Sequence, residues 1–204
     1  MRRWWRRDPD DDRGWRDLDL LVVDFETTGL DPRRDRPLSV GWVPVRGGQA
    51  VLGAAGYQVI DPAGPVPTAS IAVHGLVPED LVGADGARAV GAALREALDG
   101  HLLVAHGASL ELGMLRRCDV AVDRSDVIDT MGLARALDRL DGRPPSTDLR
   151  LSAVAARHGL PVSRAHHAAG DALTTAGLLL ALATGLEMHG AATRRALVRL
   201  SRSS

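Results

Sequence analysis

Apolar residues gather in short runs along the first two thirds of the chain, and turn residues separate the runs. Five runs have the length and the β-branched content of strands: 18–25, 38–45, 51–60, 102–105 and 127–128. An arginine-rich stretch separates the first two, and Gly47-Gly48 separates the second from the third. The glycine pair predicts that the second and third strands form an antiparallel hairpin.

Elsewhere apolar residues recur at the three- to four-residue spacing of amphipathic or buried helices. Six segments show this spacing: 87–98, 108–117, 130–140, 149–158, 169–184 and 190–200. Three early strands, followed by strands that alternate with helices, indicate an α/β fold with a mixed sheet covered by helices. We find no internal repeat, and we expect one domain over 17–185 with a basic C-terminal helix or tail at 186–204.

The first sixteen residues change from Arg and Trp to Asp without any period, which predicts a disordered N-terminal tail at 1–16. Its cations resemble the start of a signal peptide, but aspartates follow where an apolar core is required, so we do not expect export. The stretch Ala172 to Leu186 is about 15 residues long, short for a membrane span, and predicts a buried helix. The single cysteine, Cys118, excludes an intramolecular disulfide and favours a reduced, cytoplasmic compartment without membrane contact.

The formal net charge of −1 gives the chain no overall basic field. A polyanion would therefore bind through local basic patches and bound metal ions. Candidate phosphate contacts are Arg33, Arg34 and Arg36 after the first strand, with Arg164 near a histidine pair; a solvated loop surface explains them equally well. The chain has only six aromatic residues, so base stacking inside the domain contributes little and we expect weak sequence preference.

The first strand ends in two acids, Asp24 and Glu26, and a Thr27-Thr28-Gly29 turn follows. Side chains alternate along a strand, so the two acids lie on the same face. Carboxylates about 7 Å apart on a buried strand repel each other unless a cation lies between them. A solvated strand end is the ordinary explanation of two such acids. The apolar strand before them and the glycine turn after them favour a divalent metal site.

Two further acids lie near helix starts. Glu111 is in the first or second turn of the helix at 108–117, and Asp171 begins the long apolar helix five residues after His166. Each acid alone can serve as a favourable charge at a helix N-terminus. His166 and Asp171 would be about 140° apart around one helix, so they converge only if His166 precedes the helix and folds back.

Taken together and in this order, the segments resemble the DEDDh family of 3′–5′ exonucleases, most closely the proofreading epsilon subunits of bacterial DNA polymerase III. The resemblance covers roughly 18–184. Its segments are Asp24-Phe25-Glu26-Thr27-Thr28-Gly29, Val73-His74-Gly75-Leu76 with Glu79-Asp80-Leu81, Asp129-Thr130 with Leu133-Ala134-Arg135, Leu151-Ser152-Ala153-Val154-Ala155, and His166, Ala168 and Asp171 in the pattern His-x-Ala-x-x-Asp. It implies a ribonuclease-H-like exonuclease fold, with a five-stranded mixed sheet flanked by helices.

The resemblance also implies a site that holds two divalent cations, Mg²⁺ or Mn²⁺. Asp24 would bridge both cations, Glu26 and Asp171 would complete the first site, Glu111 would serve the second, and His166 would deprotonate the attacking water. The implied substrate-binding residues are Phe25, Thr27, Thr28, Leu30, His74 and His106. The implied reaction removes nucleoside 5′-monophosphates from the 3′ end of DNA, with a DNA polymerase as a candidate partner.

One motif departs from the family, whose second motif reads His-Asn-x-x-Phe-Asp. The corresponding segment here is His106-Gly107-Ala108-Ser109-Leu110-Glu111. Glutamate reaches about 1.5 Å farther than aspartate, the length of one carbon–carbon bond. Three interpretations follow: an active nuclease that uses Glu111, a weakened enzyme that favours Mn²⁺, and a non-catalytic nucleic-acid-binding module. Retention of the other acids and of His166 favours the first, and an RNA-trimming enzyme of the oligoribonuclease or ribonuclease T type is the alternative substrate class.

Overall fold

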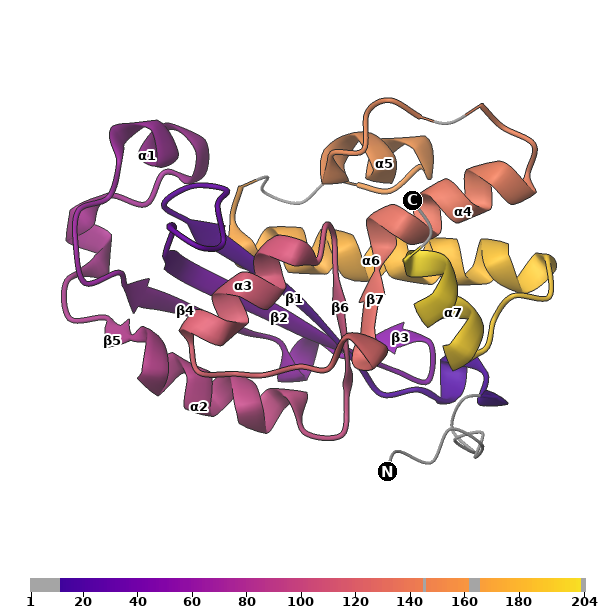
Figure 1. Ribbon diagram of the computed structural model, residues 1–204, viewed down its shortest axis with the longest axis horizontal. Coiled ribbons are helices and arrows are strands. Elements are labelled where there is room, and N and C mark those ends of the chain that lie inside the picture. The colour runs from indigo at the N-terminus through magenta and orange to yellow at the C-terminus, as the bar shows by residue number, and fades with distance from the viewer. Residues whose placement is uncertain (1–11, 145, 162–165, 203–204) are drawn as a thin grey trace.

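The computed structural model describes residues 12–144, 146–161 and 166–202, in which a mixed sheet carries helices on both faces (Figure 1). The strands are β1 (Leu20–Thr27), β2 (Pro37–Arg46), β3 (Gln49–Ala50), β4 (Gly56–Asp61), β5 (Asp85–Gly86), β6 (Leu102–Ala105) and β7 (Val127–Asp129). Their order is β5-β4-β2-β1-β6-β7, with β3 paired to the end of β2. β1 runs antiparallel to β2 and parallel to β6, and β6 runs parallel to β7. The carboxyl ends of β1, β6 and β7 therefore meet at one edge of the sheet.

The helices are α1 (Thr68–His74), α2 (Ala87–Leu98), α3 (Ser109–Arg117), α4 (Thr130–Leu140), α5 (Leu151–Arg157), α6 (Ala168–Met188) and α7 (Arg194–Ser201). The predicted mixed α/β sheet is confirmed, and two strands of only two residues, β3 and β5, raise the number of strands from five to seven. The predicted strand 51–60 begins only at Gly56, because Leu52–Ala54 forms a 3₁₀ turn. As a result β3, rather than the whole predicted strand, closes the Gly47-Gly48 turn.

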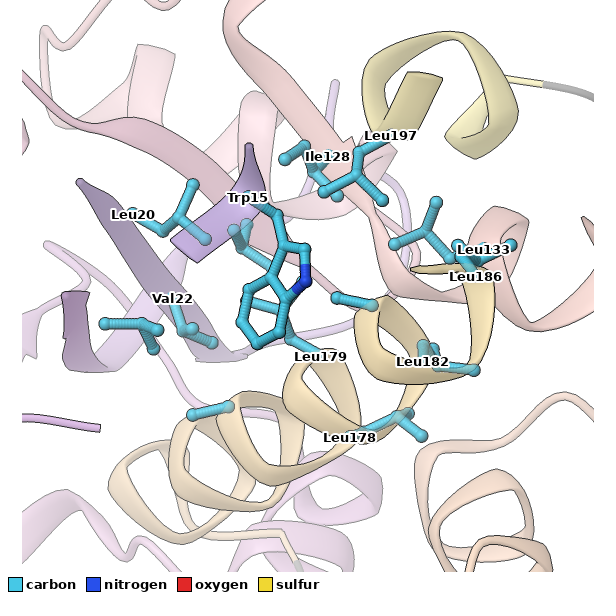
Figure 2. Packing of buried hydrophobic residues seen from close by; sticks show 14 of the residues in the cluster. Trp15, Leu20, Val22, Ile128, Leu133, Leu178, Leu179, Leu182, Leu186 and Leu197 are labelled. Atoms are coloured by element: carbon cyan, nitrogen blue, oxygen red, sulfur yellow. The ribbon is translucent and has the colours of Figure 1, made fainter. Parts of the chain in front are cut away.

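Alternating residues of β1 divide the core into two layers. Leu20 and Val22 pack in the layer that includes α6, while Leu21 and Val23 pack in the layer that includes α2 and α3. Figure 2 shows Leu20 and Val22 among the leucines of α6. This alternation is the strand period read from the sequence, and it sets the direction of every later side chain on β1.

The long helix α6 is apolar enough to cross a membrane by length and composition alone, with a mean hydropathy of 1.4. In this fold it packs on β1, β2, α4 and α5. Its side chains from Ala172 to Leu186 include many of the most buried in the core. The predicted buried helix is confirmed, and a central core helix of this kind is weak evidence for a membrane.

The expected disordered tail needs correction at its end. Trp15 is 3% exposed, lies in the layer with α6 (Figure 2), and donates its backbone N–H to the Ala192 carbonyl at 2.8 Å. Leu197 of α7 is fully buried in the same layer, so α7 belongs to the folded unit rather than to a separate tail. Local composition hides this because the apolar partners of Trp15 are distant in sequence. Residues 1–11 lie outside the described part of the chain.

Replacing Trp15 by Ala is expected to lower the free energy of unfolding by about 3–5 kcal/mol, because it leaves a large cavity in the core. The corresponding fall in Tm is roughly 10 °C, measured by circular dichroism. Trp15→Phe, which keeps most of the buried surface, should lose clearly less. An unchanged Tm in Trp15→Ala would contradict the docking of this segment.

Candidate active site

Three carboxylates meet where β1 ends and α6 begins. Ligand atoms of Asp24, Glu26 and Asp171 lie within 4.8 Å of one another. Asp24 and Glu26 continue the alternate positions of Leu20 and Val22, so the pleat of β1 directs both acids toward α6. Asp171 lies in the first turn of α6. The shared face that the sequence predicted for the two strand acids therefore receives a third acid from the helix.

A glycine in the neighbouring strand permits this approach. Gly41 of β2 is the register partner of Asp24. A Cβ atom at Gly41 would lie 2.4 Å from the Ala168 carbonyl carbon and from the Ala169 nitrogen. The first turn of α6 thus rests directly on the backbone of β2. Gly41 was not among the residues predicted for the site, although an isolated glycine inside a strand pattern is a signal of close backbone approach.

His166 precedes α6 and folds back over it, as convergence with Asp171 requires. Its φ of 57° is left-handed, and its backbone N–H donates to Asp171 Oδ2 at 2.9 Å. The next ring, His167, stacks on Tyr57 of β4 with centroids 4.7 Å apart, which fixes the start of the helix. Burial lowers the pKa of His74, and the charge of His166 lowers it further. His74, the last residue of α1, therefore lies close to His166.

Glu111 approaches Asp24 from α3. It is 3% exposed, and its Oε2 has no hydrogen-bond partner among the described residues. Burial raises the pKa of Asp24 well above its ordinary value, and Glu111 raises it more than any other charged neighbour does. Glu111 is nevertheless outside the group of three carboxylates that lie within 4.8 Å. The structure brings the fourth predicted acid beside Asp24, at the edge of the cluster.

The turn that carries Glu111 is held by Asp129, the last residue of β7. Asp129 Oδ1 accepts the backbone N–H groups of Gly107 and Met131, both at 2.9 Å, and Oδ2 accepts that of Ala108 at 3.0 Å. These bonds cap α4 and fix the turn between β6 and α3. The sequence showed Asp129 only as part of a matching segment, because this role depends on a turn more than twenty residues away.

His106 was predicted to contact substrate, but both of its ring nitrogens already have protein partners. Nδ1 lies 2.8 Å from Thr130 Oγ1, and Nε2 lies 2.7 Å from the Leu149 carbonyl oxygen. These contacts join the turn after β6 to α4 and to the loop before α5. The geometry favours a positioning role for this ring.

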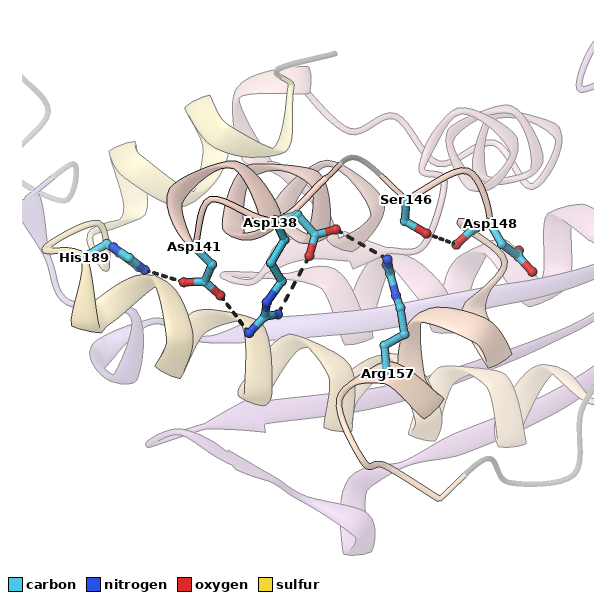
Figure 3. Close-up of polar contacts among 7 residues, drawn as sticks. Asp138, Asp141, Ser146, Asp148, Arg157 and His189 are labelled. Atoms are coloured by element: carbon cyan, nitrogen blue, oxygen red, sulfur yellow. Dashed lines mark hydrogen bonds and ion pairs between the residues drawn. The ribbon is translucent and has the colours of Figure 1, made fainter.

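A polar network fixes the loop that carries Leu149 (Figure 3). Its members are Asp138, Asp141, Arg143, Arg157 and His189, and a separate hydrogen bond joins the Ser146 hydroxyl to the Asp148 carbonyl. Asp138, 5% exposed at the end of α4, pairs with Arg157 of α5 at 3.5 Å. Asp138 thus pairs both with Arg143 at the start of the loop and with Arg157 of α5, which ties the start of the loop to the two helices.

The remaining predicted substrate residues differ in exposure. Phe25 packs in the layer with α2 and α3, so only its backbone is available to a substrate. The Thr27 hydroxyl donates to the Gly29 carbonyl at 2.6 Å, and the Thr28 hydroxyl donates to Asp35 at 3.0 Å. Leu30 is 84% exposed at the tip of this loop. The two threonines shape the loop, and Leu30 projects from it.

The arginines predicted to contact phosphate differ in their exposure and in their contacts. Arg36 donates to the carbonyl oxygens of Pro62 and Pro65, at 3.1 and 3.0 Å, and so holds two loops together. Arg33 and Arg34 are exposed, whereas Arg164 lies outside the described residues.

All four acids in this site have raised pKa values, and neighbouring acids of the site contribute to the shifts of Asp24 and Glu26. Burial is the main cause for each; it raises the pKa of Glu26 to about 7 and that of Glu111 to about 8. The pKa of Asp171 is also raised by burial, while the backbone N–H of His166 opposes the shift. Crowded carboxylates of raised pKa, one of them with an orphaned oxygen, fit a site for divalent cations, which would stabilise the charged forms.

Without metal, the protein is expected to lose stability as the pH rises from about 5 to about 8. The folded state holds protons on Glu26 and Glu111 up to pH values of about 7 and 8, against an ordinary 4.5 in the unfolded chain. Their stabilising contribution is therefore complete below the unfolded pKa and is lost as the pH rises through the folded pKa. Tm measured in a chelator should fall across this range.

Added Mn²⁺ should raise Tm more at pH 8 than at pH 6, because cation binding requires deprotonated carboxylates. Glu111→Gln, which removes one titrating group, should flatten the fall in chelator. A Tm that rises toward pH 8 without metal would contradict this electrostatic description of the site.

Known proteins match both the sequence and the fold. The Exonuclease (RNase_T) family matches residues 21–179. A DNA polymerase III subunit epsilon-like protein of Rhodobacter capsulatus is 31% identical over 183 residues, 86% of this chain and 25% of the relative. A PolC-type DNA polymerase III of Thermotoga maritima is 32% identical over 181 residues, 85% of this chain and 12% of the relative. The chain therefore spans a quarter or less of the length of these curated relatives.

Among solved structures, exonuclease X in complex with 5′-overhanging duplex DNA superposes with a TM-score of 0.70 at 22% identity. The match covers 89% of this chain and 99% of exonuclease X. At this identity the likeness shows the fold. The exonuclease fold expected from the sequence is confirmed, as is the resemblance drawn from its motifs.

Proposed function

Since this chain belongs to the Exonuclease family, we propose that it is a metal-dependent 3′–5′ exonuclease that acts on DNA. It would hydrolyse the terminal phosphodiester bond of a single-stranded or frayed 3′ end and release nucleoside 5′-monophosphates. The observation that carries the proposal is the convergence of Asp24, Glu26 and Asp171 within 4.8 Å at the carboxyl end of β1. Buried Glu111 beside Asp24 supplies a fourth acid.

The four acids would hold two cations. Asp24, Glu26 and Asp171 would hold one of them, and Asp24 with Glu111 would hold the other. A donor set made only of carboxylate oxygens suits Mg²⁺ or Mn²⁺. When bound, such cations lower the pKa of the attacking water and stabilise the attacking and leaving oxygens at phosphorus.

His166 is the group that we assign to take the proton of the attacking water. Histidine is the side chain best suited to accept a proton near neutral pH. The left-handed turn at His166 exposes the ring, and the backbone bond to Asp171 ties it to the cluster. Nearby His74 and exposed Leu30 would contact the terminal nucleotide.

The choice of DNA rests on the relatives, which are named as DNA polymerase III proteins, and on the DNA-bound exonuclease X structure. The same relatives support a polymerase as a partner. RNA is the competing substrate, and the assay that tests the function includes it.

The test uses DNA and RNA strands of one sequence, labelled at the 5′ end and incubated with Mg²⁺ or Mn²⁺. We expect a ladder that shortens from the 3′ end, faster for DNA. A ladder that shortens faster for RNA than for DNA would show that RNA, and not DNA, is the preferred substrate. Intact strands under all conditions would overturn the nuclease in favour of a binding module.

Glu111→Gln should lower kcat by about 10²-fold, because it removes one charge from the second cation site and leaves the group of three carboxylates intact. The loss should be smaller in Mn²⁺ than in Mg²⁺, since Mg²⁺ demands the stricter geometry. Rates measured against the concentration of each metal check this. Glu111→Asp, which restores the acid usual in the family, is the matched variant and should keep far more activity. Wild-type rates for both variants would show that Glu111 has no part in the mechanism.

A further inference from the structure

Outside the acidic site, arginines gather along the β7 edge of the sheet. Arg124 comes from the 3₁₀ turn Arg124–Asp126, Arg135 from α4, and Arg195 and Arg199 from α7, while Arg202 follows the last residue of α7. We call these five residues the basic band. They line two neighbouring hollows of about 460 and 340 Å³, and Arg202 lines both. The band is therefore continuous.

The charge of the two hollows is strongly positive. Among the described residues that line the larger one, Asp129 is the single acid, and backbone N–H groups already occupy both of its oxygens. The smaller hollow is lined by arginines with Ser125 and Val198. The two hollows thus form a local basic patch on a chain whose formal net charge is −1.

The band is held rigidly in place. Arg195, Arg199 and Arg202 follow one another at spacings of four and three residues and so share one face of α7. The opposite side of the helix is anchored by buried Leu197. Gly132 of α4 lets the end of α7 approach so closely that a Cβ atom there would lie 2.0 Å from the Ser201 carbonyl oxygen.

The band begins next to the acidic site. Ala108 and Ser109, at the start of α3, line the larger hollow, and Glu111 lies in the same first turn of α3. Figure 1 shows α7 and the start of α4 beside β7, with β6 between β7 and β1. A strand whose end lies at Asp24 can therefore cross the start of α3 and continue along the arginines.

We propose that the basic band binds the sugar-phosphate backbone of the nucleic-acid substrate several nucleotides upstream of the 3′ end. This inference rests on the proposed exonuclease function. Arginine binds phosphate oxygens through paired N–H groups. No aromatic side chain is among the described residues that line either hollow, so the contact is to phosphates and independent of base sequence.

The test measures binding of 5′-fluorescein-labelled dT4 and dT20 by polarisation, with Ca²⁺ in place of the catalytic metal. The variant is Arg124→Gln, Arg135→Gln and Arg199→Gln combined. Each phosphate contact on a single strand contributes about 0.7 to the slope of log Kd against log salt, so the slope for dT20 should fall by about 2. Binding of dT20 should weaken about tenfold at low salt, and the preference for dT20 over dT4 should largely disappear.

Two controls accompany the variant. Arg88→Gln, Arg116→Gln and Arg139→Gln combined removes the same charge elsewhere and should leave the slope unchanged. Arg124→Lys, Arg135→Lys and Arg199→Lys combined keeps the charge and should keep most of the slope, even if the glutamine variant folds poorly. Equal slopes for the band variant and the charge control would overturn the proposal.

The result of this binding test and the result of the exonuclease assay can fail independently of each other. If the wild-type protein binds dT20 with a band-dependent slope but cuts neither DNA nor RNA, the exonuclease proposal is rejected and the basic band is kept as a binding surface. If the wild-type protein shortens strands and the glutamine variant binds dT20 with the same affinity as the wild type, the basic-band proposal is rejected and the exonuclease proposal is kept.

Discussion

Replacing Asp24 by Asn is expected to lower the nuclease rate on the order of 10³-fold or more, with the fold intact. Asp24 belongs to the group of three carboxylates and also interacts with Glu111. A neutral amide there removes the charge shared by both cation sites, and metal assistance in such displacements contributes several kcal/mol. The variant should not unfold, because it also removes a source of repulsion among buried acids.

The measurement is kcat/KM on a labelled strand over a series of Mn²⁺ concentrations, together with Mn²⁺ binding by calorimetry. Asp19→Asn is the matched control, since Asp19 is exposed just before the other end of β1 and its side chain pairs with the exposed Arg46. The control should keep wild-type rates. Activity of Asp24→Asn within tenfold of wild type would remove Asp24 from the catalytic centre.

Gly41→Ala is also expected to have a large effect, a loss of about 10²-fold in kcat/KM. Its methyl group would lie 2.4 Å from backbone atoms of Ala168 and Ala169, where ordinary contacts begin near 3.4 Å. The first turn of α6 must therefore move by about 1 Å, and Asp171 moves with it. The cation shared by Asp171 and Glu26 should bind correspondingly more weakly.

Gly53→Ala is the control, because a Cβ atom there meets nothing within 4 Å and its φ is not left-handed. Both variants should be assayed well below their Tm, so that a loss of rate reports displacement of α6 rather than unfolding. Wild-type metal affinity in Gly41→Ala would contradict the idea that this glycine sets the position of Asp171.

Elements whose signals are local could be predicted closely. The helices at Ala87–Leu98 and Thr130–Leu140 have the predicted bounds, because their apolar period and flanking residues lie within one segment. Helix α1 was missed, since its seven residues follow a Pro/Gly-rich stretch and bury only Ser70. The docking of Trp15 was missed because distant residues of α6 and α7 create the burial.

In the candidate active site, too, local signals could be predicted from the sequence and tertiary contacts could not. The shared face of Asp24 and Glu26 follows from strand geometry alone, whereas Glu111, Asp171 and His166 could be assigned only through family resemblance. Gly41 and Asp129 went unrecognised because their roles depend on a neighbouring strand and a distant turn. The local sequence pattern therefore indicates the chemistry that a residue can perform, whereas the residues that hold it in position are known only from the tertiary contacts.

The central claim is that the acids at the end of β1 cut a strand from its 3′ end. One time course tests it: the same DNA strand, labelled at either the 3′ or the 5′ end, incubated with Mg²⁺. We expect a labelled mononucleotide as the first product from the 3′-labelled strand and a regular ladder from the 5′-labelled strand. A labelled mononucleotide released first from the 5′-labelled strand, or internal fragments from both, would contradict it.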